Sequence, residues 1–174
     1  SISRASRTFP QYLIFKPAMI ITAIILYYYW VNNNNLVNKF KLTNINYKFK
    51  TFGILSAIFL AIHSIFLGIK FDIQIYKLMR RVILLLFIIF EIIAQGMLVY
   101  HFFKIKDKIS DLINKKILIL KAISVSVLAI IALLSIPILI DKGNTHFKHA
   151  LEWNYFVGVI LFYFFTRFFW RRTT

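Results

Sequence analysis

The stretch VILLLFIIFEIIAQGMLVYHFF, residues 82–103, decides the fold of this chain. It contains a single acidic residue, Glu91, and no lysine or arginine. An α-helix rises about 1.5 Å per residue, so a stretch of this length can cross a hydrocarbon core about 30 Å thick. We therefore expect residues 82–103 to form a transmembrane helix.

Four more apolar stretches accompany this one, separated by shorter segments that carry lysine and arginine. In the second stretch, Gly53, Ser56 and Ala57 are spaced so that a neighbouring helix can approach closely. The chain is therefore predicted to be all-α, an integral membrane bundle of about five helices in a single transmembrane domain, residues 1–174. The expected spans are residues 12–31, 52–69, 82–103, 117–140 and 150–170.

Composition supports the same class of protein. The chain is 60% hydrophobic and 18% aromatic, and its mean hydropathy of +0.73 is too high for a soluble domain of this size. It contains no cysteine, which excludes disulfides, thiolate metal sites and cysteine nucleophiles. The glycine-rich, serine and histidine motifs of the common soluble enzymes are also missing from the sequence. We therefore predict no enzyme activity and no cofactor.

The charge is strongly positive, with 22 basic and 6 acidic residues and a formal net charge of +16. In a soluble chain this charge would suggest nucleic acid as the partner. Here the basic residues lie mainly between apolar stretches, where lysine and arginine meet lipid phosphates. We therefore predict anionic lipid head groups as partners, and no nucleic acid. The arginines expected to contact lipid phosphate are Arg80, Arg81, Arg167, Arg171 and Arg172.

The distribution of charge also predicts an orientation. Five spans place the two termini on opposite sides, with nine of the 22 basic residues on the N-terminal side and the rest on the other. The positive-inside rule then favours a C-terminus on the cytoplasmic or matrix face. Lys121, near the start of the span 117–140, is expected to extend its ammonium toward the interface.

Glu91 is the most informative single residue, because an ionised carboxylate inside a bilayer is costly unless it is paired or protonated. Gln95 lies one helical turn further on and is expected to share its face. One hypothesis is a proton or ion relay, or a contact with a lipid head group. The alternative is a neutral, structural glutamate that holds two helices in register.

A second polar group lies at the entry to the last span. His149 and Glu152 are three residues apart and share a helical face. With His146 and His63 they form a speculative metal site, or an acid and base pair. The alternative is that these are ordinary interfacial polar residues, with Trp153 and Tyr155 in the aromatic belt.

The last span, HALEWNYFVGVILFYFFTRFFW at residues 149–170, resembles the closing helix of the FRAG1/DRAM/Sfk1 membrane proteins. In that family an acid and aromatic pair opens the helix, matched here by Glu152 and Trp153. A Phe-x-x-Thr pattern followed by aromatics closes it. Here this element is represented by Phe162 or Tyr163 through Thr166 to Trp170, with the spacing about one residue off. The stretch FIIFEIIAQGMLVYHF also resembles the family's middle helix.

The family usually has six spans and a longer first loop, so this chain departs from its pattern. The resemblance implies a multi-pass protein linked to lipid-anchor remodelling, lipid organisation or autophagy-related membranes. It carries no catalytic signature. It makes Glu152 and Trp153, like Glu91 and Gln95, candidates for lipid or interhelical polar contact.

Three functions follow as hypotheses. The first is a small, non-catalytic accessory subunit of a larger inner-membrane complex of respiratory type, with other membrane subunits as partners. The basic, serine-rich opening SISRASR is compatible with a processed targeting segment and favours the mitochondrial inner membrane. It is equally compatible with a sequence that simply starts there, and an endomembrane or a bacterial inner membrane are alternatives. The second function is a lipid-organising or lipid-sensing protein, and the third is a membrane-embedded metal hydrolase.

Overall fold

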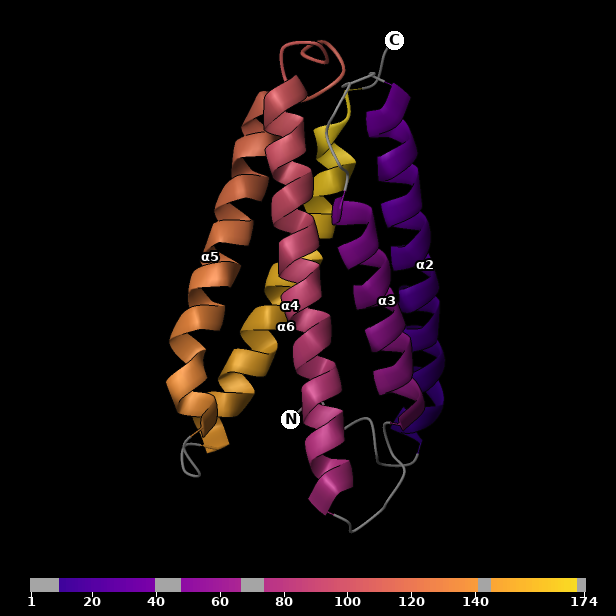
Figure 1. The fold of residues 1–174 in the computed structure, drawn as a ribbon, viewed down its shortest axis with the longest axis vertical. Helices are drawn as coiled ribbons and strands as arrows, with labels where there is room; N and C mark the ends of the chain where they lie inside the picture. The colour runs from indigo at the N-terminus through magenta and orange to yellow at the C-terminus, as the bar shows by residue number, and fades with distance from the viewer. Residues whose placement is uncertain (1–9, 40–47, 67–73, 141–144, 172–174) are drawn as a thin grey trace. The chain divides into compact units, whose positions relative to one another are not determined.

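The computed structural model describes residues 10–39, 48–66, 74–140 and 145–171. Nearly all of these residues lie in helices, and no strand occurs among them beyond an isolated bridge between Ile113 and Trp170 (Figure 1). The all-α prediction is therefore confirmed. The helices are α2 (Gln11–Lys39), α3 (Lys48–Phe66), α4 (Gln74–Ile105), α5 (Lys115–Ile140) and α6 (Thr145–Phe169).

Within the described residues, four stretches are long and apolar enough to cross a membrane. They overlap the first four predicted spans, with different ends. Helix α6 forms where the fifth span is expected, and its described apolar part, Trp153–Phe169, is shorter than a span. A crossing by α6 therefore stays a prediction. The four stretches are Leu13–Lys39, Lys48–Phe66, Leu78–Ile105 and Lys115–Ser135.

Helix α2 continues past its predicted end at Val31, through the asparagine run, to Lys39. The expected end at Val31 is therefore wrong as the end of the helix. Asparagine is a weak helix former, but tertiary packing overrides such preferences. Trp30 and Val37 are fully buried on either side of the run, and Asn33 Nδ2 donates to the Tyr29 carbonyl at 2.8 Å. Burial of the flanking apolar residues keeps the helix intact.

The chain forms two compact units, Ser1–Ala94 and Gln95–Thr174, and α4 contributes to both. In unit 1, helices α2 and α3 run side by side (Figure 1). A Cβ atom added at Gly53 would overlap the indole ring of Trp30, so the two helices meet at van der Waals distance there. Ser56 and Ala57 are buried on the same helix. The close approach predicted from these small residues is confirmed.

In unit 2, helices α5 and α6 pack on one another. Their contact includes Gly158, where an added Cβ atom would overlap the side chain of Leu128. The segment between α4 and α5 is a series of turns that is joined to the end of α6. Asn114 N donates to the Phe169 carbonyl at 2.8 Å, and Arg171 N donates to the Leu112 carbonyl at 2.9 Å. Two distant parts of the sequence are thereby held at one end of the unit.

Candidate functional sites in the two units

Glu91 lies in unit 1 with its side chain fully buried. Its Oε2 atom is 2.6 Å from the Ser56 hydroxyl of α3, which also lies 2.8 Å from the carbonyl oxygen of Gly53. Phe90, next to Glu91, stacks at 5.5 Å on Phe59 of the same helix α3. The α3 helix therefore meets α4 at a polar contact flanked by aromatic rings.

The hydroxyl of Ser56 has a single proton, whereas two oxygen atoms lie within hydrogen-bond distance of it. The Gly53 carbonyl can only accept. If the carboxyl group of Glu91 keeps its proton, it donates to Ser56 while Ser56 donates to Gly53, and both contacts become full hydrogen bonds. This geometry supports the interpretation of Glu91 as a neutral glutamate that joins two helices.

Unit 2 also contains a serine hydroxyl that lies between two oxygen atoms. Here one of the two belongs to a tyrosine hydroxyl, which has a proton of its own to donate. Ser135 donates to the Ala132 carbonyl at 2.8 Å, and its oxygen lies 3.1 Å from the Tyr155 hydroxyl. Because the serine proton is used within its own helix, the tyrosine hydroxyl is the donor between the helices. Tyr155 thus does for α6 and α5 what a protonated Glu91 does for α4 and α3.

Lys121 is a second ionisable side chain that is buried inside a helical unit. It is 1% exposed, and its Nζ atom donates to Thr166 Oγ1 at 2.7 Å. The same Nζ lies 4.2 Å from the ring centroid of Phe162 and 5.3 Å from that of Phe169. An ammonium has three donors, and here it meets one hydroxyl and two π faces. The expectation that Lys121 extends to the interface is wrong, because α6 supplies these three partners inside the unit.

Other predicted polar contacts are only partly described. Gln95 is fully buried and belongs to unit 2, whereas Glu91 belongs to unit 1. Trp153 is 52% exposed and packs edge to face on Phe156 at 6.0 Å, as expected of an interfacial tryptophan. The side chain of Glu152 lies outside the described residues.

The speculative histidine site is not assembled by what the structure describes. His63 is buried on α3 in unit 1, and its Nδ1 atom has no hydrogen-bond partner among the described residues. The side chains of His146 and His149 lie outside the described residues, in unit 2. Among the described residues, no group of three metal-ligating side chains occurs. The metal site therefore stays a prediction.

The arginines predicted to contact phosphate fall in two places. In unit 1, Arg80 is half-buried with its guanidinium 5.8 Å from the ring centroid of Tyr76. In unit 2, Arg167 and Arg171 are exposed. The side chain of Arg81 and the whole of Arg172 lie outside the described residues.

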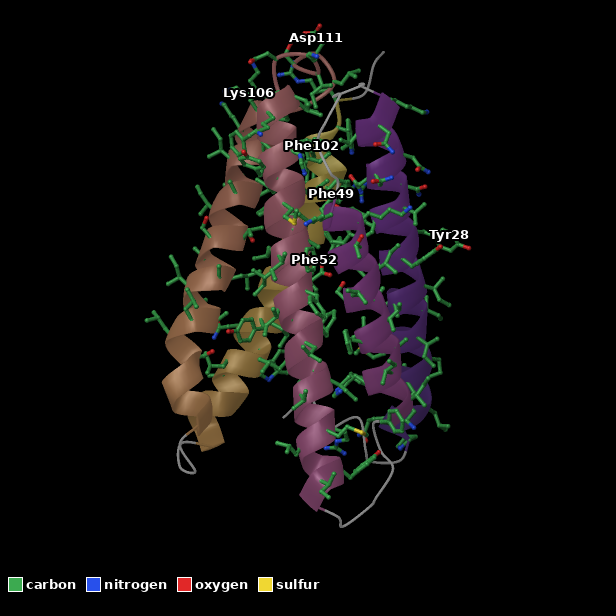
Figure 2. All side chains as sticks on the ribbon, in the orientation of Figure 1. Tyr28, Phe49, Phe52, Phe102, Lys106 and Asp111 are labelled. Atoms are coloured by element: carbon green, nitrogen blue, oxygen red, sulfur yellow. The ribbon has the colours of Figure 1, made fainter. Side chains whose placement is uncertain are left out.

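Arg167 and Arg171 are accompanied by lysines that sequence reasoning did not single out. We call this group the basic cap. It is an exposed set of seven basic side chains at the end of unit 2 where the turns after α4 meet the end of α6. The turn residues Lys106 and Asp111, labelled in Figure 2, lie at this end. The members of the basic cap are Lys104, Lys106, Lys108, Lys115, Lys116, Arg167 and Arg171.

The sequence indicated the basic cap in part, but it did not indicate the contact between Lys121 and Thr166. Residues 104–116 lie between two expected spans, in one of the segments that carry lysine. Their pairing with the end of α6 depends on two backbone hydrogen bonds that leave no pattern in the sequence. The partners of Lys121 lie 45 residues away, and only the three-dimensional packing of α5 on α6 brings them together.

These features define the class of the chain as a helical membrane protein with polar contacts buried between its helices. Comparisons with protein-family models, with curated proteins and with solved structures found no match.

Proposed function

We propose that this protein is a non-catalytic, multi-pass membrane protein that serves as an accessory subunit of a larger inner-membrane complex of respiratory type. The observation that carries the proposal is the way its buried polar groups bind one another. Glu91 lies against Ser56, Lys121 against Thr166, and Tyr155 against Ser135. Each contact joins two helices within one unit. Groups engaged in this way stabilise a scaffold and are poorly placed to turn over a substrate.

The outer faces of the helices support the same role. Large apolar side chains project from α5 and α6 along their length, and lipid tails or the helices of neighbouring subunits must cover them. The most exposed of those on α5 are Leu133 and Leu134, at 67% and 68%. On α6 the exposed set includes aromatic side chains, which supply large contact areas. They are Trp153, Phe156, Phe164 and Phe168.

The location within the cell belongs to the same proposal. The excess of positive charge is the feature that supports the mitochondrial inner membrane. A bacterial inner membrane is consistent with the same charge distribution, and an endomembrane is the remaining alternative.

The test is mild-detergent solubilisation from the native membrane, followed by size separation and mass spectrometry of co-migrating proteins. We expect the chain, whose own mass is 20.6 kDa, to migrate in a much larger assembly with a fixed set of other subunits. Migration as a well-behaved monomer, with no protein partner, would refute the subunit role.

A second candidate function is lipid organisation or sensing, as the family resemblance implies. The observation that favours it is the basic cap, which presents an excess of positive charge next to apolar helix faces. This function predicts that Glu91→Gln or Glu152→Gln changes the lipid composition of the host membrane. An unaltered lipidome in cells carrying both substitutions would exclude it.

A further inference from the structure

Backbone hydrogen bonds fix the shape of the basic cap. Lys108 N donates to the Ile105 carbonyl at 2.9 Å and Leu112 N donates to the Ile109 carbonyl at 3.0 Å, which closes successive turns. The hydrogen bonds of Asn114 and Arg171 then join these turns to α6. None of these bonds uses a lysine side chain. Lys104 Nζ lies 4.7 Å from the ring centroid of Tyr100, and all seven basic side chains are exposed to a ligand.

Apolar side chains under the turns hold them in place. Ile105, Ile109 and Ile113 are at most 1% exposed. The ring of Phe102 packs on Phe169 at a centroid distance of 4.8 Å. The turns that carry the basic cap are therefore packed on buried apolar side chains of unit 2.

The basic cap contains more positive than negative side chains. Its seven basic residues are accompanied by two exposed acids, Asp107 and Asp111, which leaves a clear excess of positive charge. Such a surface attracts anions, and each basic group near an anionic membrane surface adds to the attraction.

The surroundings of the cap distinguish among anionic partners. On α5, Ile119 and Leu120 are exposed about one turn below Lys115 and Lys116. On α6, Phe168 is exposed next to Arg167. Charge at the end of the helices with apolar surface directly below matches a phospholipid, whose head group is charged and whose tails are apolar. A nucleic acid has no hydrocarbon chains to lie along this surface.

We propose that the basic cap is a binding site for the phosphate head groups of anionic phospholipids, whose acyl chains lie along the exposed faces of α5 and α6. This inference rests on the membrane-spanning role proposed above and is independent of the accessory-subunit role. It names residues of the turns, Lys106 and Lys108, as contributors to head-group binding alongside Arg167 and Arg171.

The experiment uses the full chain, purified in an uncharged detergent and mixed with equal amounts of phosphatidylglycerol and phosphatidylcholine. Native mass spectrometry then gives the ratio of the two lipids bound. We expect phosphatidylglycerol to be preferred at low salt and the preference to weaken at high salt, because salt screens exposed charges. In the Lys106→Gln/Lys108→Gln double variant we expect the ratio to fall by about fivefold or more, the factor that corresponds to the attraction of one lysine to an anionic surface.

The matched control is Lys39→Gln/Lys48→Gln, which removes two exposed lysines from unit 1. It should change the ratio much less. The Lys106→Arg/Lys108→Arg variant keeps the charge and should retain the preference. All variants replace exposed side chains, and circular dichroism confirms that they keep their helices.

An unchanged lipid ratio in the Gln double variant would overturn the proposal, as would an equal loss in the unit 1 control. Stronger binding of a short RNA than of phosphatidylglycerol would overturn it in favour of a nucleic-acid site. None of these results depends on co-migration with other subunits, so failure of this proposal is distinguishable from failure of the proposed function.

Discussion

The two units bury ionisable side chains of opposite kind and deal with them differently. In unit 1, the Ser56 hydroxyl lies 2.6 Å from the Glu91 carboxyl group, and a proton kept on that group would let both contacts of the hydroxyl be full hydrogen bonds. In unit 2, Lys121 meets one threonine hydroxyl and two aromatic faces. An acid becomes neutral by keeping a proton, whereas the lysine is surrounded by groups that solvate a cation. The carboxyl group of Glu91 would be made neutral by its own proton, whereas the ammonium group of Lys121 depends on the groups around it.

This difference predicts that the hydroxyl of Thr166 contributes more to stability than the hydroxyl of Ser56. Ser56 serves a neutral hydrogen bond, which contributes about 1 kcal/mol, while Thr166 serves a donor that carries a charge, where about 2 kcal/mol is typical. The comparison can be tested by removing each partner in turn and measuring the free energy of unfolding in detergent micelles.

The largest effect is expected at the helix contact of unit 1. Gly53→Ala places a methyl group against the indole ring of Trp30, which is fully buried and has no room to move. Overpacking of this kind costs about 3 kcal/mol. The free energy of unfolding, from denaturation in mixed micelles, measures the loss.

Two other glycines of the chain are the controls for Gly53→Ala. Gly158→Ala meets the Leu128 side chain, which can change rotamer, so about 1 kcal/mol is expected. At Gly96 the nearest atom to an added Cβ is 3.6 Å away on Val125, an ordinary contact, and replacement by alanine should be neutral or slightly stabilising. Equal losses at the three positions would contradict the close approach of α2 and α3.

The next effect is expected at the lysine of unit 2. Thr166→Val keeps the shape of the side chain but removes the hydroxyl that accepts from Lys121, and we expect a loss of about 2 kcal/mol. Lys121→Met removes the charge while keeping an apolar chain of similar length, and it should be tolerated, because replacing a buried charge by an apolar group is often neutral.

The double variant Lys121→Met/Thr166→Val separates this explanation from a general packing defect. Without the ammonium, Thr166→Val should cost far less than in the native background, which a double-mutant cycle of unfolding free energies measures. Additive losses would show that Thr166 acts independently of Lys121.

Much of the fold was predictable because the apolar stretches are long and the bilayer sets their length. The positions of Gly53, Ser56 and Ala57 also predicted a close helix contact, since small residues on one face have few other uses. The end of α2 was not predictable, because the asparagine run is a weak helix former and its helical state depends on buried neighbours such as Trp30 and Val37.

The sequence indicated which buried polar groups require a partner, but it did not identify all of their partners. The sequence showed that Glu91 needs a partner or a proton and offered Gln95 on the same helical face, whereas the hydroxyl of Ser56 was visible only as a small residue. Lys121 was expected to reach the interface, because a lysine near the end of a span usually can. Its partners come from another helix, and no local pattern identifies them.

A smaller effect is expected from the hydroxyl contact of unit 2. Tyr155→Phe removes the donor to Ser135 while Ser135 keeps its bond to the Ala132 carbonyl, so the loss should be about 1 kcal/mol. Ser56→Ala in unit 1 also removes one neutral hydrogen bond between helices, and it loses in addition the bond of Ser56 to the Gly53 carbonyl within α3, so its cost should be similar or somewhat larger. A loss at Ser56 as large as that at Thr166 would mean that Glu91 is charged.

The smallest effect on stability, and the most direct test of the comparison, is expected from Glu91→Gln. A glutamine amide has the shape of the carboxylic acid and can donate to Ser56 in its place, so the free energy of unfolding should change by about 0.5 kcal/mol or less. Infrared spectroscopy of the folded protein at neutral pH should show the carbonyl stretch of a protonated carboxylic acid. The band should vanish in Glu91→Gln and persist in Asp107→Asn, which alters an exposed acid of unit 2. A spectrum without that band, together with a large destabilisation by Glu91→Gln, would mean that Glu91 is ionised. Unit 1 would then hold a buried charge as unit 2 does, and the two units would differ only in its sign.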